Sequence, residues 1–191
     1  MSGDKPGEIT QLLEKARSGD KLAENRLADL LMPELKRMAS RILSREYRSA
    51  TMETGDLVNE IYLKASPALK TFNDSSHFKA YVARAMHSLL IDRARRIITR
   101  EKHLGRRADF EDARDVAHGD GEGPADRAIQ IAALGKAMRE LESDDPRAVQ
   151  VVILKNGGLT NEEIAEALGV DVSTVKRDWR AARAYLSSRL G

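Results

Sequence analysis

The pattern with the clearest chemical meaning lies near the C-terminus, in residues 160–186 (TNEEIAEALGVDVSTVKRDWRAARAYL). Thr160, followed three residues later by Glu163, forms a capping box, which opens a helix. Gly169 stands where a tight turn needs a residue that tolerates positive φ, and Asp171 can cap a second helix. The segment therefore predicts two helices joined by a short turn.

The spacing of this segment is that of a DNA-binding helix-turn-helix. Gly169 follows Ala165 by four residues, and Val175 follows Gly169 by six. The small alanine allows the two helices to approach closely, the glycine makes the turn, and the valine fills the core between the helices. The second helix has an apolar stripe formed by Val175, Trp179, Ala182 and Leu186. Ser173, Arg177 and Arg180 point away from that stripe, and Thr174 and Lys176 lie on its flanks. Short hydroxyls near the helix start, followed by cations, suit entry into a major groove. The alternative is a hairpin whose basic face is merely solvated.

A second basic surface is predicted in residues 84–107, which hold eight Lys and Arg against two acidic residues. Arg93, Arg96 and Arg100 recur at helical spacing, so they form a ridge that can follow a phosphate backbone. Just upstream, Phe72 and Asn73 bring a ring and a polar group together, as single-stranded DNA binding requires. Two further aromatic residues, Phe78 and Tyr81, are expected in the core.

No catalytic or metal site is expected. The chain has no cysteine, its four histidines show no ligand spacing, and no glycine-rich phosphate loop precedes a helix. We therefore expect no enzyme activity, no metal and no cofactor. A nuclease is the rival from a different class, and DNA cleavage that is lost on chelation would reveal one.

Helical periodicity dominates the elements that must hold these residues, which predicts an all-α protein. Expected helices cover residues 8–18, a stretch from Asp20 to Ile42, residues 56–65 and residues 77–103, and periodicity resumes near Arg127. Asp20 is the expected N-cap of the second helix. Pro33 lies inside that helix, so we expect a kink or a short break there.

The chain divides into two helical domains, residues 1–107 and 127–191, joined by residues 108–126. That junction is acidic and glycine-rich, which predicts a flexible linker. The net charge of +2 thus combines a basic ridge with an acidic tether. The polar N-terminus and the absence of a long apolar run predict a cytoplasmic protein without a membrane segment.

The order of these motifs along the chain resembles that of bacterial extracytoplasmic-function (ECF) sigma factors of RNA polymerase. DLVNEIYLKA (56–65) resembles the family's polymerase-docking segment, and HFKAYVARAMHSLLIDRARR (77–96) resembles the helix that melts and reads the −10 promoter element. Residues 133–190 resemble the domain that reads the −35 element. The family commonly has Trp where Tyr81 stands and Asn where Ser88 stands.

The resemblance implies roles for individual residues. Asp56, Asn59 and Glu60 would contact core RNA polymerase. The residues implied at the −10 element are Phe72, Asn73, Ser88, Arg93, Arg96 and Arg100; those implied at the −35 element are Ser173, Thr174, Lys176, Arg177 and Arg180. The implied partners are promoter DNA, the β′ clamp helices and β flap of polymerase, and an anti-sigma factor. The main alternative is a stand-alone helix-turn-helix regulator, which would footprint DNA specifically without polymerase.

Overall fold

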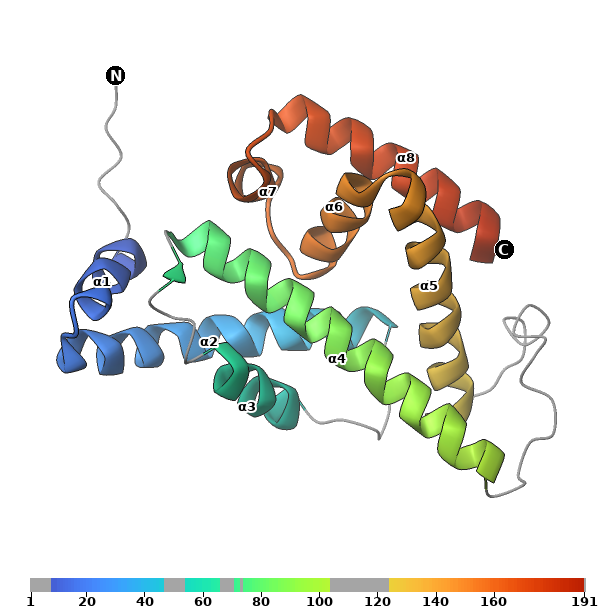
Figure 1. Ribbon diagram of the computed structural model, residues 1–191, viewed down its shortest axis with the longest axis horizontal. Coiled ribbons are helices and arrows are strands. Elements are labelled where there is room, and N and C mark those ends of the chain that lie inside the picture. The colour runs from blue at the N-terminus through green and yellow to red at the C-terminus, as the bar shows by residue number, and fades with distance from the viewer. Residues whose placement is uncertain (1–7, 47–53, 66–70, 73, 104–123, 191) are drawn as a thin grey trace.

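A computed structural model describes residues 8–46, 54–65, 71–72, 74–103 and 124–190. Over these residues the chain forms eight helices and no strand (Figure 1). The prediction of an all-α protein is therefore confirmed. The first four helices come from the N-terminal half of the chain and the last four from the C-terminal half.

The chain begins with a helical hairpin, α1 (Glu8–Arg17) and α2 (Lys21–Glu46). Gly19, with φ of +91°, makes the turn between them. The Asp20 carboxylate then accepts hydrogen bonds from the N–H groups of Leu22 and Ala23, at 2.9 and 3.1 Å. Asp20 is thus the N-cap of α2, as predicted.

The helix α2 continues through Pro33, so the prediction of a short break there is wrong, whereas the alternative, a kink, stays a prediction. Proline removes one backbone hydrogen bond from a helix interior, but the helix packs its apolar face on both sides of that position. Leu31 and Leu35 are both buried, whereas Pro33 itself is exposed. Burial of the flanking leucines holds the two parts of α2 in one helix.

Helices α3 (Thr54–Ala65) and α4 (Ser75–His103) complete the N-terminal half. The α4 helix starts after Asp74, whose carboxylate accepts the His77 N–H at 2.8 Å and lies 2.7 Å from His77 Nδ1. Burial acts to raise the pKa of Asp74, but these hydrogen bonds outweigh it and the pKa is lowered. Phe78 and Met86 are buried on α4, so this helix lies at the centre of the core.

The C-terminal half comprises α5 (Pro124–Asp144), α6 (Pro146–Asn156), α7 (Asn161–Leu168) and α8 (Val172–Leu190). The start of α5 at Pro124 corrects the expected start near Arg127, and proline suits the first position of a helix. Residues 108–123 of the predicted linker lie outside the described residues, and residues 124–126 belong to α5.

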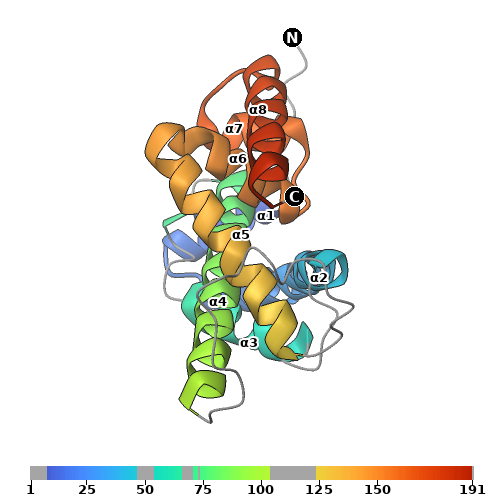
Figure 2. The same ribbon diagram turned by 90° about the vertical axis from the view of Figure 1, so that its right-hand side faces the viewer.

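The two halves pack against each other along α4. Figures 1 and 2 both show α5 beside the C-terminal part of α4, while α7 lies near its N-terminal end in Figure 1. One core cluster includes residues from both halves, such as Phe78, Leu154 and Ile164. A second, smaller cluster lies between α5, α6 and α8. The division into domains at 107 and 127 stays a prediction; in this structure the halves share a core.

Candidate nucleic-acid interface

The turn between α7 and α8 has the local geometry that its residues predict. The Thr160 hydroxyl accepts the Glu163 N–H at 3.1 Å, and the Glu163 carboxylate accepts the Thr160 N–H at 2.8 Å, so the capping box is complete. Gly169 ends α7 with φ of +65°, a left-handed conformation in which glycine avoids a Cβ clash. The Asp171 carbonyl accepts the Val175 N–H at 3.2 Å, which places Asp171 at the start of α8.

The α8 helix separates apolar and polar residues as expected. Val175 and Ala182 are fully buried, and Trp179 and Leu186 pack against the core clusters. On the opposite face, Thr174 is half-buried, and the exposed residues of the predicted −35 set are Ser173, Lys176, Arg177 and Arg180. The Arg180 Nε donates to the Lys176 carbonyl at 3.2 Å. These five residues therefore lie on one accessible surface.

A buried carboxylate lies directly beside this surface. Asp178 is only 3% exposed, and its Oδ2 accepts a hydrogen bond of 2.6 Å from Nε of Arg147 on α6. This hydrogen bond and the Asp178 charge raise the pKa of Arg147. Arg177 Nε lies 3.7 Å from Asp178 Oδ1. Helical periodicity did not single out Asp178, although its position next to Trp179, toward the inner side of the helix, is consistent with burial.

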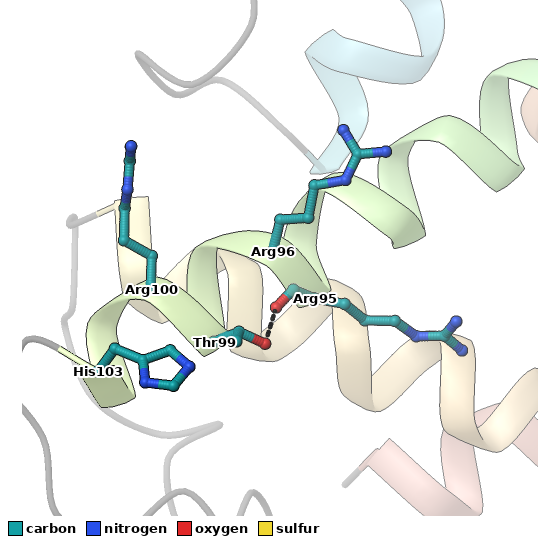
Figure 3. A pocket seen from close by; sticks show the side chains of 5 residues that line it. All are labelled: Arg95, Arg96, Thr99, Arg100 and His103. Carbon is teal, nitrogen blue, oxygen red and sulfur yellow. Dashed lines mark hydrogen bonds between the residues drawn. The ribbon is translucent and has the colours of Figure 1, made fainter.

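The basic ridge of α4 is accessible. Arg96 and Arg100 are exposed, and Arg93 is half-buried. Figure 3 shows the side chains of Arg96 and Arg100 extending to one side of α4, whereas Arg95 extends away from them. Ser88, one of the residues implied at the −10 element, is also exposed, two turns before Arg96. The structure thus places four of the six predicted −10 residues along the last two-thirds of one helix.

The ridge borders a surface hollow of about 520 Å³, lined by Arg95, Arg96, Thr99, Arg100 and His103. The Thr99 hydroxyl donates to the Arg95 carbonyl at 2.9 Å, and Arg95 Nη1 lies 3.7 Å from the Asp92 carboxylate. Arg95, Thr99 and His103 were missed, although they recur every four residues. Their spacing forms a second stripe beside the ridge, with hydrogen-bond donors suited to phosphate oxygens.

One of the predicted −10 residues, Phe72, is not on this surface. Phe72 is buried, with its ring centroid 5.4 Å from that of Phe78 and 5.1 Å from that of Tyr81. Its carbonyl accepts a hydrogen bond of 2.7 Å from Arg17. In this structure the Phe72 ring therefore belongs to the core and offers no face to a nucleobase. Asn73 lies outside the described residues.

The predicted polymerase-docking residues lie on α3. Asp56 and Asn59 are exposed, and Glu60 is half-buried, with a carboxylate oxygen 3.7 Å from Lys64 Nζ. Leu63, which the docking motif did not single out, is 73% exposed. It lies seven residues after Asp56, four after Asn59 and three after Glu60. These spacings place all four residues on one helix face. An acidic face with an exposed leucine is suited to protein binding.

Neither a metal cluster nor a membrane-spanning helix is found in the described residues. No group of three or more His, Asp or Glu side chains gathers in these parts of the chain in a way that could hold a metal ion. None of the helices in the same parts is long and apolar enough to cross a bilayer.

Comparison with known proteins identifies the family. The sequence model of ECF sigma factors matches residues 6–191, which is nearly the whole chain and includes α3, α4 and the α7–α8 pair. Comparison with curated proteins gives no match. Since the family match covers both helical halves, this chain belongs to the ECF sigma factor family.

Proposed function

We propose that this protein binds core RNA polymerase in the cytoplasm and directs it to start transcription at promoters with a particular pair of −10 and −35 elements. One observation carries the proposal: the ECF family match includes three separate accessible surfaces, an acidic face, a basic ridge and a basic helix face. Each surface has the chemistry of one step that a sigma factor performs.

The acidic face of α3 is the proposed docking site for the β′ clamp helices. Asp56 and Asn59 are exposed there and can pair with cationic and polar groups of a partner, and Leu63 adds apolar contact. The C-terminal half is proposed to contact the β flap. An anti-sigma factor is a further partner that family membership suggests.

The ridge of α4 is the proposed contact to the −10 region. Its arginines are suited to phosphate oxygens because the guanidinium group is always charged and donates in a planar fork. Arg96 and Arg100 are the exposed members, and Ser88 adds a hydroxyl on the same helix.

The α8 surface is the proposed reader of the −35 duplex: Ser173 lies at the helix start, and Arg177 and Arg180 can reach guanine edges or phosphates.

Binding to purified core polymerase tests the docking step and separates a sigma factor from a stand-alone regulator. The full chain should co-elute with core, and the double variant Asp56→Arg with Glu60→Arg should not, while its helical circular dichroism is retained. A matched control is Lys36→Glu with Arg37→Glu, a double charge reversal on α2. Sequence-specific footprinting by the free chain, without any affinity for core, would contradict the proposal and favour the regulator.

A further inference from the structure

Asp178 is the one charged residue that is buried among those whose side chains the structure describes. It lies on α8 between Val175 and Ala182, which are both fully buried. A buried ion pair adds little net stability, because the desolvation of its charges offsets most of their attraction. Apolar residues of similar volume can serve such a position equally well. Packing alone therefore does not account for a carboxylate at this place.

Arg147 on α6, which packs against α8 (Figure 1), holds both oxygens of this carboxylate. Arg147 Nε donates to Oδ2 of Asp178 at 2.6 Å, and its Nη2 lies 3.5 Å from Oδ1. The arginine itself belongs to a fixed helical turn: Pro146 opens α6, and the Asp145 carboxylate accepts the Ala148 N–H at 3.0 Å. A planar guanidinium that meets a carboxylate in this way fixes its orientation as well as its position.

The same carboxylate attracts Arg177, its neighbour on α8. Arg177 Nε lies 3.7 Å from Oδ1 of Asp178, within the range of an ion pair. The Arg177 side chain is 68% exposed, so the rest of its guanidinium group is accessible to a ligand. Because the carboxylate lies on the Nε side, the two terminal Nη groups can donate outward. A buried acid thus lies between two arginines, one from α6 and one on the proposed −35 surface.

The terminal N–H groups of an arginine match one base in the major groove. Guanine presents N7 and O6 as adjacent acceptors there, and a bidentate arginine is the commonest specific contact to them. A long side chain that is free to rotate loses rotamer freedom when it binds, which reduces its affinity. A side chain that is already held by a fixed carboxylate loses less.

We propose that Asp178, held by Arg147, is a positioning residue that orients Arg177 so that its terminal N–H groups meet N7 and O6 of one guanine in the −35 element. This inference rests on the proposed function and names the base that one residue of α8 reads. Loss of the Asp178 charge should have two opposite effects. Binding to any duplex gains from the removal of a negative charge near the phosphates, whereas the preference for guanine falls because Arg177 is released.

Promoter fragments that carry single base analogues test this directly. In each fragment one guanine of the −35 element is replaced by 7-deazaguanine, which lacks the N7 acceptor. Polymerase holoenzyme with the wild-type chain should bind one of these fragments about 10-fold more weakly than the intact promoter, the usual effect of one hydrogen bond to a charged group. Holoenzyme with Arg177→Ala should bind the same two fragments equally well, which identifies the guanine that Arg177 reads. The proposal is overturned if no guanine meets both conditions.

Asp178→Asn then tests the positioning role, because it keeps the shape of the side chain and removes its charge. The ratio of affinities for the intact and the substituted promoter should fall about threefold, the cost of ordering one long side chain, while affinity for an unrelated duplex should not fall. A purely structural role would lower thermal stability but not this ratio, since the same folded protein binds both fragments. Glu142→Gln, the same charge change at an exposed position of α5, should keep the wild-type ratio. A wild-type ratio in Asp178→Asn would overturn the proposal.

Two further variants cover the case in which Asp178→Asn does not fold. Arg177→Lys keeps the positive charge at an exposed position but has no planar fork, so it should lose the preference for guanine and keep the salt dependence of binding. Arg147→Met removes the group that holds Asp178 and should lower the ratio at the same guanine. A wild-type ratio in Arg177→Lys would overturn the guanine contact, and a wild-type ratio in Arg147→Met would overturn the role of Arg147 in positioning.

Failure of this inference is distinguishable from failure of the proposed function. If the proposed function is wrong, the wild-type chain does not bind core, no promoter complex forms with any variant, and the positioning role is overturned with it. If only the positioning role is wrong, the wild type and the Asp178→Asn variant both bind core and start transcription, and their affinity ratios at the guanine are equal.

Discussion

The carboxylate of Asp178 on α8 lies 2.6 Å from Nε of Arg147 on α6, and it is the buried member of the pair. The Arg147 side chain is 45% exposed, whereas that of Asp178 is 4% exposed. An ion pair of this kind connects α8, which carries the proposed −35 surface, to α6 beneath it. Loss of the arginine would leave a buried charge with Arg177, 3.7 Å away, as its remaining cation.

Replacement of Arg147 by alanine should therefore destabilise the C-terminal half, although the residue lies at the surface. The buried carboxylate loses its hydrogen-bonded partner, and an unpaired buried charge is more costly than a lost surface contact. We expect the thermal unfolding midpoint to fall by several degrees. Glu140→Ala, which removes an exposed partner 3.9 Å from Arg189, is the control and should leave the midpoint nearly unchanged. Equal effects of the two variants would contradict this role of Arg147.

Arg177→Ala and Arg180→Ala should weaken use of the −35 element. Each lost base contact costs about 1–3 kcal/mol, which corresponds to about 5- to 150-fold in affinity. The measurement is holoenzyme binding to promoter fragments with an intact or a scrambled −35 element. Core binding should not change, and Arg189→Ala, near the far end of the same helix, should have little effect. Loss of core binding in either arginine variant would count against the assignment of this surface to DNA.

If the ridge on α4 contacts phosphates, removing its arginines should reduce the salt dependence of DNA binding. Each phosphate contact on single-stranded DNA contributes about 0.7 to the slope of log affinity against log salt concentration. Arg96→Ala with Arg100→Ala should therefore lower the slope by about 1.4 in titrations of the full chain with a single-stranded oligonucleotide. Lys36→Ala with Arg37→Ala removes two cations from α2 and serves as the control. An unchanged slope in the ridge variant would exclude these arginines as phosphate contacts.

Leu63 should contribute to polymerase binding together with the acidic residues beside it. It is one of the large apolar side chains that the structure leaves exposed, at 73%, in line with Asp56 and Glu60 on α3. Leu63→Ala should weaken core affinity by about 1–2 kcal/mol, the usual transfer cost of much of a leucine side chain. Leu22→Ala is the matched control, since Leu22 is 80% exposed and belongs to a different helix, α2. Similar affinities of the two variants for core would remove Leu63 from the docking face.

The contact between α4 and α5 should weaken in acid because of His87. Burial lowers the pKa of this residue to about 4, whereas an unfolded histidine has a pKa of about 6.5. The unfolded chain therefore binds the proton first, and the stability of the folded chain falls as the pH falls from about 6.5 toward 4. The limiting loss is about 3.5 kcal/mol, since one pKa unit corresponds to about 1.4 kcal/mol.

Denaturant titrations of wild type and His87→Leu at pH 7 and pH 5 measure this effect. The wild type should lose more stability between the two values than the leucine variant, in which other acid-sensitive groups still titrate. His103→Leu, at an exposed position near the end of the same helix, should behave like the wild type. The same pH dependence in wild type and His87→Leu would contradict this role of His87.

Local patterns predicted most of the elements of this fold. The capping box at Thr160, the turn at Gly169 and the cap at Asp20 each depend on residues within a few positions, and the structure has all three. The outcome at Pro33 depends on packing instead, because α2 stays continuous by burying leucines on either side of the proline. A prediction made from the proline alone does not take account of the free energy that burial of these leucines contributes.

The relationships that the sequence did not reveal join distant parts of the chain. Glu163 has the appearance of a solvated residue in a first helical turn, yet it pairs with Lys79, 84 positions away. Phe72 has a polar neighbourhood in sequence, but its ring packs against Phe78 and Tyr81. Asp178 is a charged residue beside an aromatic one, and its burial depends on Arg147 from another helix. Periodicity indicates which face of a helix is apolar, but it does not indicate which charged group that helix meets.

Run-off transcription tests most directly whether this chain gives core RNA polymerase its promoter specificity. Core enzyme is incubated with a library of genomic fragments, with and without the full chain, and the starts of the transcripts are sequenced. We expect a set of transcripts that requires the chain, shares one −10 and −35 pair upstream, and disappears with Asp56→Arg and Glu60→Arg. Transcription that is the same with and without the chain, although the chain is folded and core is active, would contradict this expectation.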